Sequence, residues 1–420
     1  YVENDPFITD RQYDELLEEL RQEGRALRQS ASNLGKRDVL FYMTEQGILP
    51  NYAFPEEGVT LKSIIKHSDV EGRDPTIYEY PRAAAAGLSE FAPGSQVYAE
   101  GRQVEVDQID MRSSDVETWR FCPACTYAAR VEHEQNETCP SCGSHRWADV
   151  NQKGRVIRLR QVVARAQDRR ARIGDDREER RVEPFERRLL PCFTPDRIEK
   201  AYAAPGDVTS FGYEYLRSVS FKEVNFGRIS DAQGPSVSGN AVGASGFRIC
   251  TKCGMTAKRS NGQIEHTYQC PSRNAEDDSS SIDCTYVYRE FKSEALRILM
   301  PTHAGEVETG SRSFAAALRL GLSRNFHGKV DHLRTTVTNQ NDGAVNRQYL
   351  FLYDTVPGGT GYIRQLVNDP GELRDVLQAA VSAMETCACT AQPEADGCYK
   401  CILGHKETRG FGGISRTRAV

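Results

Sequence analysis

The sequence has no long apolar run. No stretch of its 420 residues approaches the roughly 18 consecutive apolar residues that a membrane-spanning helix needs. We therefore expect no membrane partner and predict a cytoplasmic protein. The formal net charge is only −5, so total charge does not indicate a nucleic-acid partner, and any basic surface must be local. With 39% hydrophobic and 27% charged residues, the composition is typical of a soluble globular protein of several domains.

The signatures of common catalytic sites are also missing. The glycine-rich segment Gly358–Gly361 is not followed by the Gly-Lys-Ser/Thr of a phosphate-binding P-loop, and the chain has no Asp-Glu-x-His box. It also lacks the Gly-x-Ser-x-Gly turn of serine hydrolases and the His-Glu-x-x-His of zinc proteases. We therefore assign no catalytic residue, and the sequence leaves open whether the chain belongs to an enzyme.

Cysteine, in contrast, is abundant. Of thirteen cysteines, twelve fall into three groups of four and Cys192 stands apart. Disulfide scaffolds are typical of short secreted chains, whereas paired Cys-x-x-Cys units in a long chain are typical of zinc sites. The first group has two such units separated by thirteen residues, close to a zinc ribbon, and consists of Cys122, Cys125, Cys139 and Cys142. Gly143, after the last of them, permits a left-handed backbone conformation.

The second group leaves its fourth ligand open. Cys250 and Cys253 form a clear Cys-x-x-Cys unit, and Cys270 and Cys284 follow. His266 stands at His-x-x-x-Cys spacing before Cys270, so it could replace Cys284 as a ligand. We favour Cys284, because thiolate-rich structural sites are common and a single histidine has many other uses.

The third group is the most compact, with four cysteines within fifteen positions: Cys387, Cys389, Cys398 and Cys401. Zinc is the main interpretation, and an iron–sulfur cluster is the alternative because it also takes four thiolates. The chain is therefore predicted to bind three structural zinc ions. Zinc with four protein ligands has no open position for water, so these ions are not expected to be catalytic.

The hydrophobic pattern indicates an α+β protein of several domains. Residues 5–50 have helical periodicity, and alternation from Pro93 onward predicts short strands, with a return strand over Arg155–Arg160. We interpret this second region as a small β-barrel with the zinc ribbon inserted in it. Further strands are expected between residues 208 and 300, a helix over 311–324 and a strand over 348–356. A last long helix should begin at Pro370 with Asp369 as its N-cap.

These elements suggest four domains. The expected ranges are a helical connector at 1–85, the barrel with its zinc ribbon at 86–190, a second zinc-bearing β region at 191–289, and a C-terminal α/β zinc-binding domain at 290–420. The first residue is Tyr1 rather than Met, so we expect the chain to be a fragment.

One stretch is basic. Residues 153–188 hold thirteen Lys or Arg against seven acidic residues, which predicts phosphate contacts by a set of arginines: Arg158, Arg160, Arg165, Arg169, Arg170 and Arg172. The alternative, weighted equally, is a solvated surface where interleaved acids neutralise the arginines. The backbone amides of Gly358 and Gly359, between a strand and a helix start, are candidate phosphate donors. A tight turn that needs glycine is the favoured interpretation there.

The C-terminal third resembles a known family. Tyr353–Tyr362, the pair Cys387 and Cys389, and Asp396–Cys401 occur in the order found in the MrfA-like zinc-binding (MZB) domain, and the resemblance covers roughly residues 290–405. That domain closes the C-terminus of certain superfamily-2 helicases. Leu49–Pro55 and Glu90–Gly94 also resemble the segment that follows the motor in large bacterial helicases, among them MrfA repair helicases and the Druantia and DISARM phage-defence proteins.

The resemblance implies a role in DNA processing, with ATP and Mg²⁺ used by a motor located upstream. Both motor lobes are missing here, so the motor could belong to the same chain or to a separate helicase subunit. The predicted function is therefore an accessory C-terminal region of a DNA helicase in phage defence or repair, which binds or guides single- or double-stranded DNA. The alternatives are a zinc-stabilised scaffold that docks a helicase without touching DNA, and a hydrolase, which the missing catalytic motifs disfavour.

Overall fold

The computed structural model describes residues 58–420 with gaps, together with a few isolated earlier positions. The gaps are 68–73, 115, 133–135, 168–183, 204–210, 232, 259–261, 276–278, 301–306, 329, 342–345, 393–395 and 404–412. The helices expected between residues 5 and 50 therefore lie outside the described residues, apart from isolated helical positions such as Leu17. No helix among the described residues is both long and apolar enough to span a bilayer.

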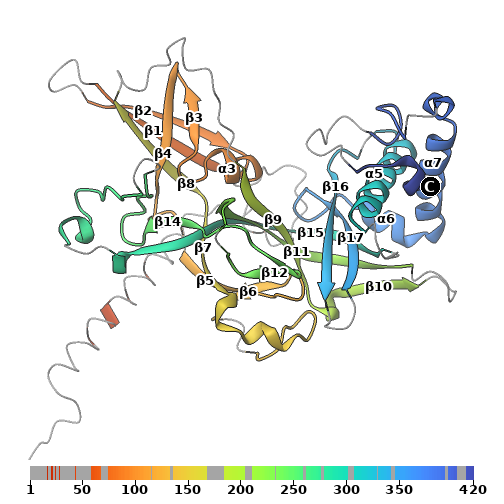
Figure 1. Ribbon diagram of the computed structural model, residues 1–420, viewed down its shortest axis with the longest axis horizontal. Coiled ribbons are helices and arrows are strands. Elements are labelled where there is room, and N and C mark those ends of the chain that lie inside the picture. The colour runs from red at the N-terminus through yellow and green to blue at the C-terminus, as the bar shows by residue number, and fades with distance from the viewer. Residues whose placement is uncertain are drawn as a thin grey trace, which may run out of the picture.

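The first layer is a five-stranded sheet with the order β2-β1-β8-β4-β3. Its strands are β1 (Val59–Lys66), β2 (Thr76–Arg82), β3 (Gln96–Ala99), β4 (Arg102–Ile109) and β8 (Gln161–Gln167). β1 and β8 run parallel, and the other pairs are antiparallel. The short helix α3 (Ala84–Glu90) packs against this sheet, with Leu88 and Phe91 in the shared core (Figure 1).

The second layer is a ten-stranded sheet that contains most of the strands among the described residues. Its strands are β5 (Val116–Phe121), β6 (Ala128–Arg130), β7 (Lys153–Arg158), β9 (Phe185–Cys192), β10 (Ile198–Ala203), β11 (Gly212–Arg228), β14 (Phe247–Cys250), β15 (Ile282–Leu299), β16 (Leu333–Asn341) and β17 (Asn346–Asp354). A separate hairpin is formed by β12 (Ser236–Val237) and β13 (Asn240–Ala241). Short 3-10 turns are η1 (His145–Ala148), η2 (Val150–Gln152), η3 (Pro195–Arg197), η4 (Pro271–Asn274), η5 (Ser279–Ser281) and η6 (Ala388–Ala391).

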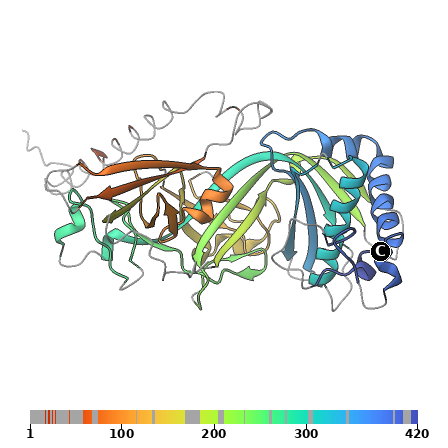
Figure 2. The same cartoon turned by 90° about the horizontal axis from the view of Figure 1, so that it is seen from above.

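Two long strands connect the parts of this sheet. β11 has 17 residues and β15 has 18, and they pair antiparallel along most of their length. β15 also pairs with β14 and β7 near its start and with β17 near its end. Figure 2 shows these strands running from the middle of the molecule to its helical end. Alternating aromatic and β-branched residues suit such strands because each face packs against a different core.

The helical end covers one face of β15, β16 and β17 (Figures 1 and 2). It is built from α5 (Val307–Asn325), α6 (Tyr362–Asn368), α7 (Pro370–Glu385) and the C-terminal α8 (Arg416–Ala419). The Asp369 side chain caps α7 by accepting a hydrogen bond from the Gly371 N–H at 2.8 Å, as predicted. At Gly321 of α5, an added Cβ would lie 2.1 Å from the Val376 carbonyl oxygen of α7, so the two helices pack closely.

The α+β class is confirmed, whereas the strand arrangement corrects the expected domain limits. β1 and β2 fall inside the segment predicted to be a helical connector, and they complete the sheet of β3, β4 and β8. The zinc-ribbon strands β5 and β6 extend the large sheet through β7 rather than interrupting a small barrel. A boundary at residue 290 would cut β15 in two. Sequence periodicity missed these links because it identifies strands and not their partners.

Candidate metal centres

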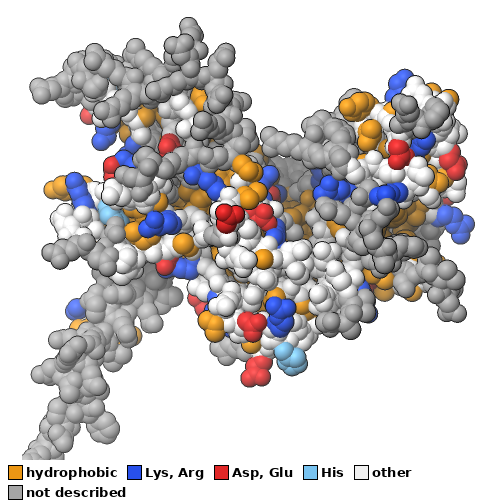
Figure 3. All heavy atoms as spheres, in the orientation of Figure 1, with side chains coloured by type: hydrophobic (Ala, Val, Ile, Leu, Met, Phe, Trp, Pro, Cys, Tyr) orange, Lys and Arg blue, Asp and Glu red, His pale blue; other side chains and the backbone are white. Residues whose placement is uncertain are grey.

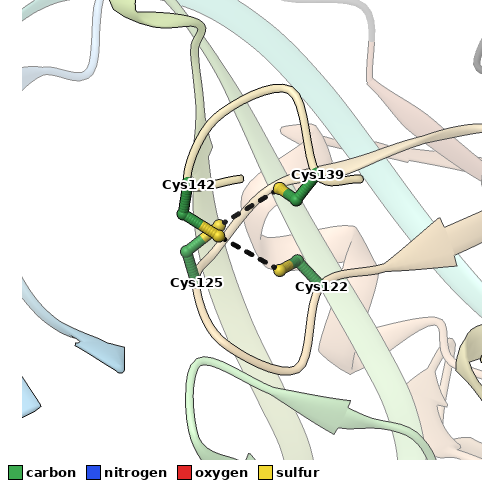
Figure 4. A group of neighbouring side chains, drawn as sticks. All are labelled: Cys122, Cys125, Cys139 and Cys142. Atoms are coloured by element: carbon green, nitrogen blue, oxygen red, sulfur yellow. Dashed lines mark hydrogen bonds between the residues drawn. The ribbon is translucent and has the colours of Figure 1, made fainter. Parts of the chain in front are cut away.

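The first centre lies where two tight loops meet below the large sheet. Cys122 follows β5 directly, Cys125 precedes β6, and Cys139 and Cys142 come from the second loop. Figure 4 shows the four sulfur atoms converging on one point. The Sγ atoms of Cys122 and Cys142 lie 3.6 Å apart, and those of Cys125 and Cys139 lie 3.7 Å apart. All four ligand atoms are within 4.8 Å of one another.

This spacing fits a single tetrahedral zinc ion. With a zinc–sulfur bond of about 2.3 Å, the edge of the tetrahedron is about 3.8 Å, close to the separations at this centre. A disulfide would place the two sulfurs only about 2.05 Å apart, so these cysteines are not bridged. The sequence prediction that these four residues come together is therefore met by the geometry.

Backbone N–H groups around the first centre favour the thiolate form of its cysteines and hold its loops in place. The N–H groups of Ala124 and Tyr127 each lie 3.4 Å from a sulfur, of Cys122 and Cys125 respectively, and such contacts favour the thiolate form. Gly143 has φ +74°, the left-handed conformation predicted for it. Trp147 is fully buried against the cysteines, and the Ser238 N–H donates to the carbonyls of both Cys122 and Cys125.

The second centre is closed by a histidine. The structure groups Cys250, Cys253, His266 and Cys270. The Sγ atoms of Cys250 and Cys270 are 3.8 Å apart, and Nδ1 of His266 lies 3.6 Å from Cys253 Sγ and 3.5 Å from Cys270 Sγ. Bonds of about 2.05 Å to nitrogen and 2.3 Å to sulfur give a tetrahedral edge of about 3.6 Å, which these values match.

The preference for Cys284 as fourth ligand is thereby corrected in favour of the alternative, His266. Cys284 lies within β15, where it is exposed and stands opposite Arg248 of β14. Cys250, at the end of β14, is buried and pairs with Ile282, two residues before Cys284. Strand pairing holds Cys284 at an exposed position outside the group, whereas the segment from His266 to Cys270 forms a local turn that can close on the ion.

The third centre joins the end of α7 to the C-terminal tail. The Sγ atoms of Cys387 and Cys398 are 3.5 Å apart, and those of Cys389 and Cys401 are 3.7 Å apart. The Lys400 N–H points at Cys398 Sγ, and this contact lowers the pKa of the Cys398 thiol to about 7. The four sulfurs converge on one point, which leaves no room between them for an iron–sulfur cluster.

The tail contacts this third centre from outside. Nη1 of Arg416 lies 3.4 Å from Cys389 Sγ, and the Asp396 carboxylate accepts from both the N–H and the hydroxyl of Thr417 at 2.9 Å. The Ser415 N–H donates to the Ser313 hydroxyl of α5 at 2.9 Å. A cation beside a zinc-bound thiolate offsets its negative charge and fixes its orientation.

The thirteenth cysteine belongs to none of these centres. Cys192 ends β9, is buried, and directs its thiol at the carbonyl oxygens of Thr126 and Leu190. Burial raises the pKa of Cys192 to about 11, so the thiol stays protonated at neutral pH and is a poor metal ligand or nucleophile.

The predicted DNA-contact arginines are only partly described, and the described ones have partners within the protein. Nη1 of Arg165 lies 3.0 Å from Oδ1 of Asp107 on the neighbouring strand, and Nη2 donates to the Gln108 side chain. Burial raises the pKa of Asp107 to about 6, and Arg165 opposes that shift. Because this guanidinium is only partly exposed and already paired, it is a poor phosphate ligand.

Arg158 and Arg160 also interact inside the chain. Arg158 lies near the buried carboxylate of Glu290. Burial raises the pKa of Glu290, but Lys222, the Ser220 hydroxyl and Arg158 outweigh that effect and lower it. The remaining three, Arg169, Arg170 and Arg172, lie outside the described residues. Figure 3 shows Lys and Arg side chains spread across the width of one face, with Asp and Glu beside them at several places.

The structure of the glycine loop decides between its two interpretations, a phosphate site and a tight turn. The Gly358 N–H donates to the Lys292 carbonyl at 2.8 Å, and the Gly359 N–H donates to the Val356 carbonyl at 2.9 Å. Neither amide is therefore available to a phosphate. Gly359 has φ +77°, and an added Cβ there would lie 2.6 Å from Cγ of Glu294, which explains the need for glycine.

Two internal carboxylates accept hydrogen bonds from the next two amides of the loop. The Thr360 N–H donates to Oδ2 of Asp354 at 2.7 Å, and the Gly361 N–H donates to Oε1 of Glu294 at 2.9 Å. Asp354 is completely buried, and burial raises the pKa of Glu294. The loop is thus a strand-to-helix turn held by acidic side chains, the interpretation favoured from the sequence.

One group of residues escaped the sequence analysis. Tyr399 and Lys400, between the last two cysteines, are both exposed, and they face a cavity also lined by Arg319 and Arg324 of α5. The only sequence signal was the identity of the two residues inside Cys398–Cys401. Their proximity to α5 depends on the fold.

The comparison with protein families defines the class of the C-terminal part. Residues 314–402 match the model of the MrfA Zn-binding domain, a range that begins within α5 and ends just after Cys401. This part of the chain is therefore an MrfA-like zinc-binding domain, as the sequence resemblance implied.

The particular relatives are larger proteins. Druantia protein DruE from Escherichia coli (strain UMEA 4076-1) is 21% identical over 402 residues, which cover 84% of this chain and 20% of DruE. Among solved structures, the DUF1998 helicase MrfA bound to DNA has a TM-score of 0.41 at 13% identity, covering 87% of this chain and 33% of that one. MrfA bound to DNA and AMPPNP has a TM-score of 0.34 at 11% identity, with 87% and 31% covered. The chain thus spans about a fifth of DruE and a third of MrfA.

Proposed function

We propose that this chain is the accessory C-terminal region of a large ATP-dependent DNA helicase or translocase that acts in phage defence or DNA repair. The observation that carries the proposal is the third centre, embedded in an MrfA-like zinc-binding domain, within a chain that aligns with DruE over 84% of its length. ATP and Mg²⁺ would act in the motor, either upstream in the same chain or in a separate subunit. The similarity to a Druantia protein favours defence, and the expected location is the cytoplasm.

Each metal centre would hold one structural zinc ion. The proposed ligands are Cys122, Cys125, Cys139 and Cys142 in the first centre, Cys250, Cys253, His266 and Cys270 in the second, and Cys387, Cys389, Cys398 and Cys401 in the third. Four protein ligands fill the zinc shell at each centre, so the ions stabilise the fold and do not activate water. Elemental analysis of the purified protein should find close to three zinc ions per chain. Fewer than two zinc ions, with freely titrating thiols, would contradict this part of the proposal.

The role toward DNA would be to bind or guide a strand at the motor. Arg169, Arg170 and Arg172 remain candidate phosphate ligands, whereas the internal ion pair of Arg165 speaks against that residue. This pairing also favours the alternative function, a zinc-stabilised scaffold that docks a helicase without touching DNA.

Two measurements separate these functions. Fluorescence anisotropy with labelled single-stranded and duplex oligonucleotides, at two salt concentrations, should show binding that weakens steeply with salt. Absence of binding to either probe at low salt would favour the scaffold. Translating the gene upstream of Tyr1 tests the helicase assignment, because a Walker A motif and an Asp-Glu box there would place the motor in the same chain.

A further inference from the structure

A cavity of about 610 Å³ opens beside the third metal centre. One wall is the second half of α5, with Arg319 and Arg324, and the opposite wall is the loop that contains Tyr399 and Lys400. The turn after α5, Leu333 of β16 and Ile414 of the tail contribute the rest of the lining. The volume lies within the range of sites that bind small ligands or short segments of a longer one.

The two walls are held in a fixed relation to each other. Nη2 of Arg324 donates to the Lys400 carbonyl at 3.4 Å, which links α5 to the zinc-binding loop. Below this contact, Ala317 of α5 packs with Cys401 and Ile402 in a shared buried core. A cavity formed by two packed elements and a metal centre is pre-organised, so ligand binding carries little cost for ordering it.

The turn after α5 has an unusual backbone. His327 has φ +52° and Gly328 has φ +78°, and the Gly328 N–H closes the helix by donating to the Ser323 carbonyl at 2.8 Å. Two successive left-handed residues end α5 abruptly and leave His327 exposed at the cavity. A non-glycine residue in this conformation is uncommon, and histidine adds a further hydrogen-bonding group beside the arginines.

The charged groups at this cavity favour an anion. Arg319, Arg324 and Lys400 line it, and Asp331 is the single acid among its described lining residues. A zinc ion with four thiolates carries two negative charges, which opposes this preference. Two of the four thiolates, those of Cys389 and Cys401, are buried, and the guanidinium of Arg416 and the Lys400 N–H point at sulfurs of the same centre. Arg324 and Lys400 are exposed, so their cationic groups meet an incoming ligand at the cavity surface.

The exposed ring of Tyr399 indicates which class of anion the cavity binds. The residue is 59% exposed, although a large aromatic side chain normally packs against the protein. An exposed aromatic ring next to cationic side chains is the combination that binds unpaired nucleotides, because the ring stacks on a base while the cations hold phosphates. A duplex keeps its bases stacked inside and cannot use such a ring.

We infer that this cavity binds single-stranded nucleic acid, with a base stacked on Tyr399 and phosphates held by Arg319, Arg324 and Lys400. The inference rests on the proposed function in DNA processing and gives it a specific contact on the MrfA-like zinc-binding domain. The cavity is a different surface from the basic stretch of residues 153–188, where the described arginines are paired internally.

The test measures the affinity of the whole chain for a fluorescein-labelled dT12 oligonucleotide. Tyr399→Ala should weaken binding by about tenfold, whereas Tyr399→Phe, which keeps the ring, should stay within about twofold of wild type. The double change Arg324→Gln and Lys400→Gln should reduce the salt slope by about 0.7 for each phosphate that is no longer neutralised. Zinc content close to that of wild type shows that the variants are folded.

Tyr268→Ala is the matched control. Tyr268 is 87% exposed near the second centre and has the guanidinium of Arg273 5.0 Å from its ring centroid, yet it does not line the cavity. This variant should bind dT12 like wild type. An equal loss of affinity for Tyr268→Ala and Tyr399→Ala would overturn the assignment to this cavity.

The remaining outcomes separate the two proposals. Wild-type binding of dT12 that Tyr399→Ala leaves unchanged would sink the cavity assignment and preserve the DNA function. If the wild-type chain binds neither dT12 nor duplex DNA, both the cavity assignment and the DNA-binding function are wrong. A poly-glutamate peptide that binds more tightly than dT12, and that loses affinity on Tyr399→Ala, would identify the site as one for acidic peptides instead.

Discussion

The first and third metal centres use the same four thiolates in different surroundings. The first lies under the large sheet, with Trp147 buried against it and the β12–β13 hairpin bonded to its loop carbonyls. The third lies at the periphery, where Cys387 and Cys398 are only half-buried and Tyr399 and Lys400 are exposed. The difference indicates that a zinc ion can brace a sheet from within or join the C-terminal segment to helices at the edge of the fold. In the second case, side chains next to the ligands stay on the surface, where a partner can reach them.

The strongest test compares equivalent ligands of the two centres. Cys142 and Cys398 are both half-buried, and substitution of either by serine should remove one zinc ion per chain. We expect Cys398→Ser to lower the melting temperature by roughly 10 °C, because zinc binding contributes strongly to the local fold. Cys142→Ser should have a smaller effect, since β5 remains paired with β7. Differential scanning fluorimetry with zinc analysis measures both, and an equal or larger drop for Cys142→Ser would reverse the comparison.

The second centre tests whether one histidine can replace a thiolate. His266→Ala should reduce the zinc content from three ions to two and lower the melting temperature by roughly 5 °C. Cys284→Ser is the control, because that residue is exposed and outside the group, and it should keep all three ions. Loss of zinc in the Cys284 variant would restore the ligand set that the sequence favoured.

Substitutions in the glycine loop test how tightly the C-terminal domain packs at a place away from its zinc ligands. Gly359→Ala should destabilise the protein by roughly 2–4 kcal/mol, because the new Cβ would meet Glu294 and φ is positive. Gly361→Ala is the matched variant, with φ +88° and no heavy atom within 4 Å of the added Cβ, and should cost only about 1 kcal/mol. Urea unfolding gives both values. Equal costs would show that Glu294 moves freely.

The smallest expected effect is the pH dependence of stability that Asp107 contributes, which differs in sign from that of the zinc ligands. The folded-state pKa of Asp107 is raised to about 6 from 3.8, so this group stabilises the fold fully below its unfolded pKa and loses that contribution as pH rises through about 6. Protonation of zinc ligands acts in the opposite direction, with stability falling as pH falls. Asp107→Asn should remove a contribution on the order of 1–2 kcal/mol between pH 4 and pH 7. An unchanged pH profile of unfolding would show that Asp107 keeps its ordinary pKa.

What the sequence could predict was local. Cys-x-x-Cys units fold within one turn, so the cysteine groups of the first and third centres and the cap at Asp369 were predicted correctly. The choice between His266 and Cys284 failed because it depends on which segment folds back onto the Cys250–Cys253 unit, and the turn from His266 to Cys270 does so. The domain limits failed because β1 joins β8 across about a hundred residues of chain. For the same reason, a charge run in sequence did not predict that Arg165 would pair with Asp107.

The long strand β15 has a consequence for folding cooperativity. Its side chains belong to several separate cores, with Val287, Tyr288, Phe291 and Leu296 each in a different one. Because strand side chains alternate between faces, a single inserted residue near its start would turn every later side chain to the opposite face. All of these cores would lose their packing together. The sheets, ribbon and helical end are therefore expected to melt in one transition, as a single folding unit.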